Sequence, residues 1–225
     1  MRKWGIVVSL VYFAIVAFLL LPAGCLLAGV DFKDLGDAYK EWSIWVVMAM
    51  LVLGQAVLLF LSVDISRKRL KPRAHIAVSC IVTALLVALL SIAVVTSLVV
   101  ATRSDSFSFN SSDGLFDRFL GSYTQLFEFI AAFWLFWGVV FYSFLRNSNQ
   151  ATTRAISWLL KGSVLELLVV LPCHIVVRRR DDCSAPIVTG FGISTGIAIM
   201  LLSFGPSVLF LYKKRLDSYA RQSSR

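Results

Sequence analysis

Residues 158–186, WLLKGSVLELLVVLPCHIVVRRRDDCSAP, decide how this chain is folded. The stretch begins as an apolar run around one carboxylate, Glu166, and continues through Pro172 to three arginines, two aspartates and a cysteine. Ionisable groups are expensive inside a bilayer, so each of them needs a partner or a purpose. The stretch therefore contains the candidate functional site. It also contains the segment that decides the number of membrane spans, according to whether it crosses the membrane.

The composition of the chain is that of an integral membrane protein. Of its 225 residues, 58% are hydrophobic, and the mean hydropathy is +0.80. The apolar residues form runs of about twenty or more, the length needed to cross a hydrocarbon layer of ~30 Å. The formal net charge is +9, but Lys and Arg are concentrated in alternate loops rather than in one patch. Because such alternation is a topology signal, we expect membrane lipids as partners and no nucleic acid.

We expect an all-α polytopic transmembrane helix bundle that forms a single domain over residues 1–225. The alternative is five spans plus a re-entrant segment, if 156–177 enters the membrane and returns. With a cytoplasmic N-terminus, six spans put 15 of the 22 Lys and Arg on the cytoplasmic side. Five spans would put the basic C-terminal tail on the opposite side of the membrane. The positive-inside bias thus favours six spans with both termini in the cytoplasm. The predicted spans are about 4–29, 43–63, 76–101, 123–145, 156–177 and 187–212.

Helical spacing brings polar side chains of the quoted stretch onto one face. Glu166 and Cys173 are seven residues apart, and Arg180 is seven further on if the helix continues. Pro172 removes one backbone donor and favours a local opening of the helix. Glu166 is expected near the bilayer midplane, where a carboxylate is either neutral or paired, and we expect it to be paired. The candidate ligand-binding residues are Glu166, His174, Arg178, Arg179, Arg180, Asp181 and Asp182.

Each of these residues has a structural alternative. Glu166 can serve as a hydrogen-bond partner between helices, and His174 as a polar cap near the membrane surface. The three arginines can extend to lipid phosphates as a headgroup anchor. A site for a small anionic solute, a lipid or a proton is therefore one interpretation of the cluster, and helix assembly is the other.

No metal site and no cofactor is predicted. Cys173, His174 and Cys183 are competent ligands, but adjacent Cys-His is not a standard spacing, and neither CxxC nor His-Glu-x-x-His occurs. Gly192 and Gly196 form a GxxxG pattern that suits close helix packing. No catalytic set is recognised, so we do not expect an enzyme.

The cysteines on the outer side leave two readings open. In the six-span topology Cys183 is the most exposed and is the candidate for a disulfide, with Cys173 or Cys25 as its partner. Such a pair needs α-carbons within about 7 Å, which the sequence does not establish. The alternative is a free thiol at Cys183.

Parts of the last third of the chain resemble a known family. The segment Gly162–Leu168, the triplet Pro172–His174, the cluster Arg178–Cys183 and the triplet Phe204–Pro206 are similar to a block in an uncharacterised family of small multi-pass bacterial membrane proteins. Members often carry a second cysteine where this chain has Ser184, so the resemblance does not imply a vicinal dithiol here. It implies a bacterial inner membrane and no activity.

Three classes of function fit these observations. The first is an inner-membrane protein that binds or translocates a small anionic solute, a lipid or a proton through the polar site on the fifth span. The second is a non-catalytic accessory or scaffold subunit, with other membrane subunits or a second copy of itself as partner. The third is a membrane-embedded metal or redox enzyme.

Overall fold

The structure is a computed structural model that describes residues 2–27, 29, 36, 39–40, 42–65, 72–102, 123–145, 151–180 and 186–204. Within these ranges the regular structure is entirely helical. The candidate residues Asp181, Asp182 and Cys183 lie outside the described residues, as does the end of the last predicted span. The helices are α1 (Arg2–Ile15), the π-helix η1 (Val16–Leu20), α2 (Leu21–Leu27), α4 (Trp42–Ile65), α5 (Pro72–Thr102), α7 (Tyr123–Leu145), α8 (Ala151–Arg178) and the Pro186–Phe204 helix.

Six of the described helical segments are long and apolar enough to cross a membrane, which confirms the predicted helix bundle. Each falls on one of the predicted runs. α8 is a continuous helix of 28 residues that passes through Pro172, and at 1.5 Å per residue it extends about 42 Å. A segment that enters and returns is therefore wrong for this part of the chain. The segments are Gly5–Leu27, Ile44–Leu61, Ile76–Thr102, Phe127–Leu145, Thr152–Arg178 and Pro186–Phe204.

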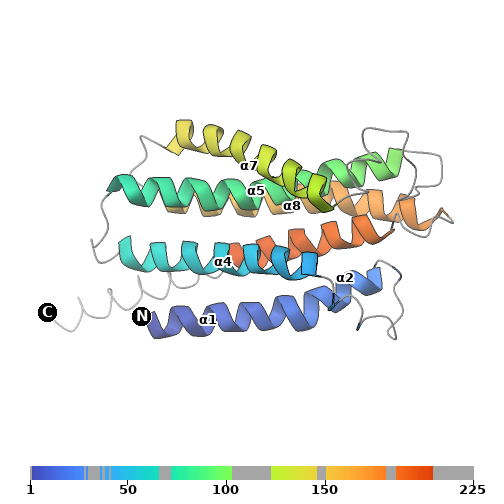
Figure 1. Ribbon diagram of the computed structural model, residues 1–225, viewed down its shortest axis with the longest axis horizontal. Coiled ribbons are helices and arrows are strands. Elements are labelled where there is room, and N and C mark those ends of the chain that lie inside the picture. Colours follow the sequence, from blue (N-terminus) through green and yellow to red (C-terminus); the bar gives the residue numbers. More distant parts are fainter. Residues whose placement is uncertain are drawn as a thin grey trace, which may run out of the picture.

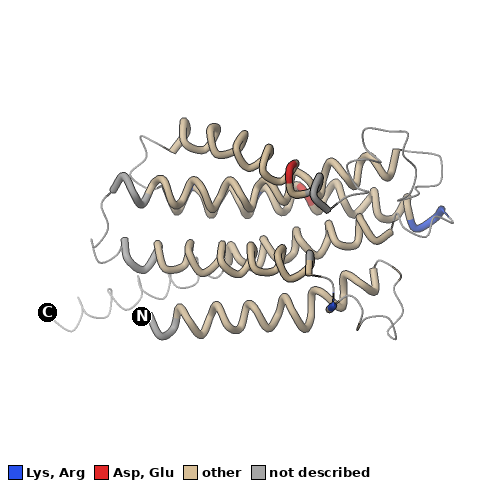
Figure 2. Tube along the Cα trace, in the orientation of Figure 1, with Lys and Arg blue, Asp and Glu red and all other residues tan. Residues whose placement is uncertain are grey.

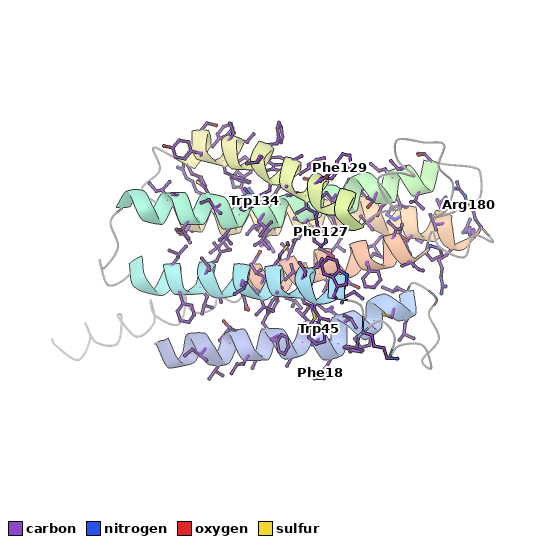
Figure 3. The ribbon with its side chains drawn as sticks, in the orientation of Figure 1. Phe18, Trp45, Phe127, Phe129, Trp134 and Arg180 are labelled. Atoms are coloured by element: carbon purple, nitrogen blue, oxygen red, sulfur yellow. The ribbon has the colours of Figure 1, made fainter. Side chains whose placement is uncertain are left out.

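The six segments run alternately up and down along one bundle axis (Figure 1). α5 and the Pro186–Phe204 helix lie in the centre, since 56% and 50% of their apolar windows are buried, against 17% for α7. The end of the bundle at which α8 finishes is called the Arg180 end here (Figure 3), and α1 begins at the opposite end. In Figure 2 the described tube is almost wholly uncharged, and a run of basic residues marks the Arg180 end.

α5 and α8 each bury a stripe of residues that are three or four positions apart, and α5 buries further residues beside its stripe. This spacing keeps a stripe facing its neighbour in the left-handed packing that is common among membrane helices. The α5 stripe mixes hydroxyl, small and leucine side chains, and the α8 stripe contains Glu166. The buried stripe of α5 is Ser79, Thr83, Leu86, Leu90, Ala93, Ser97 and Val100, and that of α8 is Thr152, Ala155, Leu159, Ser163, Glu166, Val170, Cys173 and Val177.

The first span changes helix type where a proline interrupts its hydrogen bonds. The N–H of Leu21 bonds to the carbonyl of Val16, five residues back, and Pro22 has no N–H for the next carbonyl, that of Ala17. The hydroxyl of Tyr39 donates to this carbonyl at 2.7 Å. Desolvation by burial raises the pKa of Tyr39, so the phenol remains a donor. The π-helix is thus held from outside the span.

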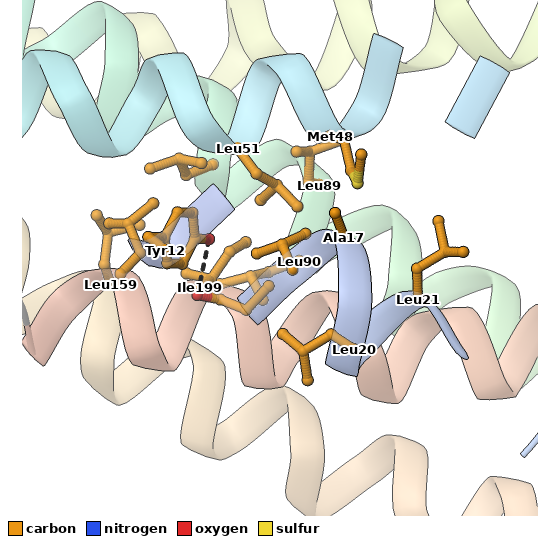
Figure 4. Close-up of a cluster of buried hydrophobic side chains, with 14 of the residues drawn as sticks. Tyr12, Ala17, Leu20, Leu21, Met48, Leu51, Leu89, Leu90, Leu159 and Ile199 are labelled. Atoms are coloured by element: carbon orange, nitrogen blue, oxygen red, sulfur yellow. Dashed lines mark hydrogen bonds between the residues drawn. The ribbon is translucent and has the colours of Figure 1, made fainter. Parts of the chain in front are cut away.

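The main apolar cluster joins α1, α4, α5, α7, α8 and the Pro186–Phe204 helix (Figure 4). Leu90, Leu159 and Ile199 belong to it, and the latter two are wholly buried. The hydroxyl of Tyr12 donates to the carbonyl of Ala198 at 3.0 Å, which fixes α1 to the last helix. By contrast, large apolar side chains such as Phe18, 74% exposed, point away from the bundle, as expected of lipid-facing positions (Figure 3).

Candidate functional site

The candidate site lies where α8 and the Pro186–Phe204 helix pack antiparallel to each other. Three levels of contact define the register, and each is one helical turn from the next. Glu166 meets Gly196 at the first level and Val170 meets Gly192 at the second. The third level pairs His174 with Thr189 through a hydrogen bond.

Glu166 is 1% exposed, and its carboxyl group lies directly on the backbone of the last helix. A Cβ at Gly196 would overlap the Oε2 atom of Glu166 and come within 3.1 Å of Leu167 Cδ2. Glycine is therefore required at 196 for the carboxyl group to occupy this place. The sequence indicated close packing through this glycine but did not indicate that a carboxylate was the group packed against it.

Neither oxygen of Glu166 has a hydrogen-bond partner among the described residues. The pairing expected from the sequence is thus wrong for this part of the chain. An ion without a partner in a low-dielectric interior costs several kcal/mol, whereas a neutral carboxyl with an unmade hydrogen bond costs about 1–3 kcal/mol. The arrangement favours a protonated Glu166 or one that holds a small cation.

Glu166 lies near the middle of its span. It follows Thr152 by fourteen residues and precedes Arg178 by twelve in the span Thr152–Arg178. At 1.5 Å per residue these intervals are about 21 Å and 18 Å. This count is what a location at the bilayer midplane requires, and that location stays a prediction.

His174 is 8% exposed and lies two turns nearer the Arg180 end than Glu166. Its Nδ1 atom is 2.8 Å from the Oγ1 atom of Thr189, which is wholly buried. The Thr189 hydroxyl is also 3.2 Å from the carbonyl of Pro186. His174 is therefore a hydrogen-bonded link between α8 and the last helix whose second ring nitrogen is not engaged by Thr189.

The three arginines do not act as one cluster. Arg180 donates to the carbonyls of Val100 and Ala101, at 3.4 and 2.7 Å, and so caps the C-terminal end of α5. Arg178 and Arg179 are exposed. Only these two are free to face lipid phosphates or a solute at the membrane surface.

The described cysteines give no support to a metal or disulfide site. Cys25, Cys80 and Cys173 are buried free thiols, so neither proposed partner of Cys183 is in a disulfide. Within the described residues no three His, Cys, Asp or Glu side chains come together to hold a metal ion.

Ser97 is the member of the site that the sequence analysis missed. It is wholly buried on α5, and its hydroxyl has no hydrogen-bond partner among the described residues. Its Oγ atom is 3.3 Å from the point where a Cβ would lie at Gly192. The three-and-four spacing of hydroxyl and small residues in α5, from Ser79 to Ser97, is the signal that could have identified it.

Comparison of the chain with family models, curated proteins and solved structures gives no match. The resemblance to the bacterial family therefore stays a prediction.

Proposed function

We propose that this chain is a multi-pass membrane protein in which Glu166 takes up and releases a proton as part of transport. The observation that carries the proposal is a buried carboxyl near the midplane, both of whose oxygens lack a partner among the described residues. Acidic residues inside membrane spans mark ion pathways and proton relays. A site between packed helices at the midplane is also where transporters bind their coupling ions.

The charge around Glu166 favours a proton over an anionic solute. Of the basic residues of α8, Lys161 and Arg154 are exposed, and Arg178 is three turns away at the Arg180 end. An anion at Glu166 would meet a group that is itself neutral or negative. We therefore assign any contact with lipid phosphates to the exposed Arg178 and Arg179, and the proton to Glu166.

The proposed setting is the bacterial inner membrane with both termini in the cytoplasm. The distribution of Lys and Arg supports this orientation, and the family resemblance supports the bacterial membrane. In this orientation the Arg180 end faces the outside of the cell. A reporter fused after Arg225 should be cytoplasmic, and a periplasmic reporter would overturn the orientation.

An accessory subunit is the alternative, and one observation favours it. α7 is the least buried span, and it exposes Leu135, Phe136 and Val139 by 61–72%. Native mass spectrometry of gently extracted protein separates the two functions, because a second chain retained in fixed stoichiometry would indicate assembly.

The protonation state of Glu166 can be measured by infrared spectroscopy of the purified protein in lipid nanodiscs. We expect a carboxyl C=O stretching band at neutral pH that is absent from Glu166→Gln and that disappears reversibly at alkaline pH while the helices remain folded. Glu128→Gln is the matched control, since Glu128 is a carboxyl residue of a span but is exposed. If Glu166→Gln removes no band, or if the band persists at every pH at which the protein is folded, Glu166 does not exchange a proton.

A further inference from the structure

The two directions from Glu166 along the bundle differ in their chemistry. Thr189, Gly192 and Gly196 are separated by three or four residues, so the three levels of contact follow one another at intervals of about 5 Å. Toward the Arg180 end the levels hold Ser97 and then His174 with Thr189. A polar group thus stands at each level between Glu166 and the Arg180 end.

The polar groups of this half are available for proton transfer. The Ser97 hydroxyl is unpartnered within the described chain. The missing side chain at Gly192 lets Ser97 and the wholly buried Val170 both approach the backbone of the last helix. His174 is one turn from the exposed Arg178. The distance between neighbouring levels, about 5 Å, is longer than a hydrogen bond of about 3 Å. Proton transfer from one level to the next therefore requires water molecules to enter.

The opposite direction holds larger apolar side chains together with buried polar groups. Leu90 and Ile199 lie about one turn from the Glu166 level and Leu159 lies two turns from it, and all three are at most 3% exposed. The hydroxyl of Ser163 in this half already bonds to the carbonyl of Leu160. Thr83, a buried hydroxyl without a described partner, lies beyond this layer, one turn past Leu86. Gln55, whose Oε1 atom has no described partner, follows Gly54, which packs against Leu86 one turn from Leu90.

We propose that Glu166 exchanges its proton with the water at the Arg180 end through Ser97 and His174, while the layer of Leu90, Leu159 and Ile199 closes the other end. The proposal rests on the proposed function and adds the direction of access. The proton leaves the carboxyl oxygen of Glu166, passes to water beside Ser97 and reaches the ring nitrogen of His174 that Thr189 does not engage. Glu166 and His174 are the only buried groups among the described residues, besides Tyr12 and the thiols, that titrate.

Hydrogen–deuterium exchange of the Glu166 carboxyl tests the path. The full-length protein in nanodiscs is transferred from H₂O to D₂O, and the shift of the band identified by Glu166→Gln is followed in time. We expect Ser97→Ala and His174→Phe to slow this shift about ten-fold each, the factor for one hydrogen bond lost at the barrier. Thr83→Ala, which removes an equally buried and unpartnered hydroxyl of the same helix, should leave the rate unchanged.

The possible outcomes separate the two proposals. Absence of the band overturns the proposed function itself. A band that exchanges at the wild-type rate in both Ser97→Ala and His174→Phe overturns only the path, as does a Thr83→Ala variant that is slowed as much as they are.

Thiol labelling in oriented vesicles checks the direction by a second route. With the four native cysteines replaced by alanine, Ser97→Cys should react with a small membrane-impermeant thiol reagent added on the Arg180 side. Thr83→Cys, about 21 Å nearer the other end, should not react from that side. Labelling of Ser97→Cys only from the opposite side, or from neither side, contradicts the proposed access.

Discussion

The contact among α5, α8 and the Pro186–Phe204 helix has two halves that differ in side-chain size. On the Arg180 side of Glu166 the helices meet through Gly192, Ala93 and Ser97, and on the other side through Leu90, Leu159 and Ile199. Small residues let backbones approach, and leucines fill the space between backbones that are further apart. In the half with small residues Ser97 lies against Gly192, and His174 is hydrogen-bonded to Thr189.

This difference in side-chain size also separates the half that stabilises the bundle from the half that holds the proton site. Helices in a bilayer gain little from the hydrophobic effect on association, so packing holds them together. A buried leucine makes many dispersion contacts, whereas a hydrogen bond between membrane helices contributes about 0.6 kcal/mol on average. We therefore expect the leucine half to carry most of the stability and the polar half to carry the proton site.

The largest effect is expected where the two halves meet, at Gly196. The side chain of Gly196→Val would overlap the Glu166 carboxyl and press on Leu167, and overpacking of this severity should cost about 4 kcal/mol. Gly138→Val is the matched control, because no atom lies within 4 Å of a Cβ at Gly138. Reversible unfolding in bicelles measures both. Equal stabilities of the two variants would mean that the carboxyl does not lie on the last helix.

A cavity in the leucine half should have the next largest effect. Leu159→Ala removes a wholly buried side chain and should lower the free energy of unfolding by about 3 kcal/mol. Leu168→Ala, on the same helix but 70% exposed, should change it by less than about 1 kcal/mol. The same unfolding assay compares them. If the exposed leucine matters as much as the buried one, the leucine half is not the main source of stability.

The spans could be predicted because the thickness of the hydrocarbon layer fixes the length of an apolar run. Their ends could not, and α8 illustrates the reason. Its span begins at Thr152 rather than near 156. The polar residues at this end have the composition of a loop, but contacts with another helix keep them helical. The hydroxyls of Thr152 and Ser79 are 3.1 Å apart in the interior.

Only the part of the candidate site that lies on a single helix could be predicted from the sequence. Periodicity put Glu166 and Cys173 on one face, and both are buried. Ser97 and Thr189 were missed because a sequence does not state which helices adjoin. Among the described residues the pairing expected for Glu166 failed for the same reason, since the group opposite it is the backbone at Gly196.

The smallest effect is expected at the hydrogen bond between His174 and Thr189. Thr189→Val keeps the shape of the side chain but removes the hydroxyl, so it should lower the free energy of unfolding by about 0.6 kcal/mol. Thr195→Val is the control on the same helix, because the Thr195 hydroxyl bonds only to the carbonyl of Phe191 in its own helix at 2.8 Å. Loss of the Thr195 hydroxyl should therefore leave the free energy of unfolding almost unchanged.

Thr189→Ser decides whether the hydroxyl or the methyl group is responsible. A serine hydroxyl can still reach His174 Nδ1, so this variant should be more stable than Thr189→Val although it has lost a methyl group from a wholly buried position. The opposite order would show that packing, and not the hydrogen bond, connects α8 to the last helix at this level. The polar half would then be held together in the same way as the leucine half, and the contrast between them would be one of side-chain size alone.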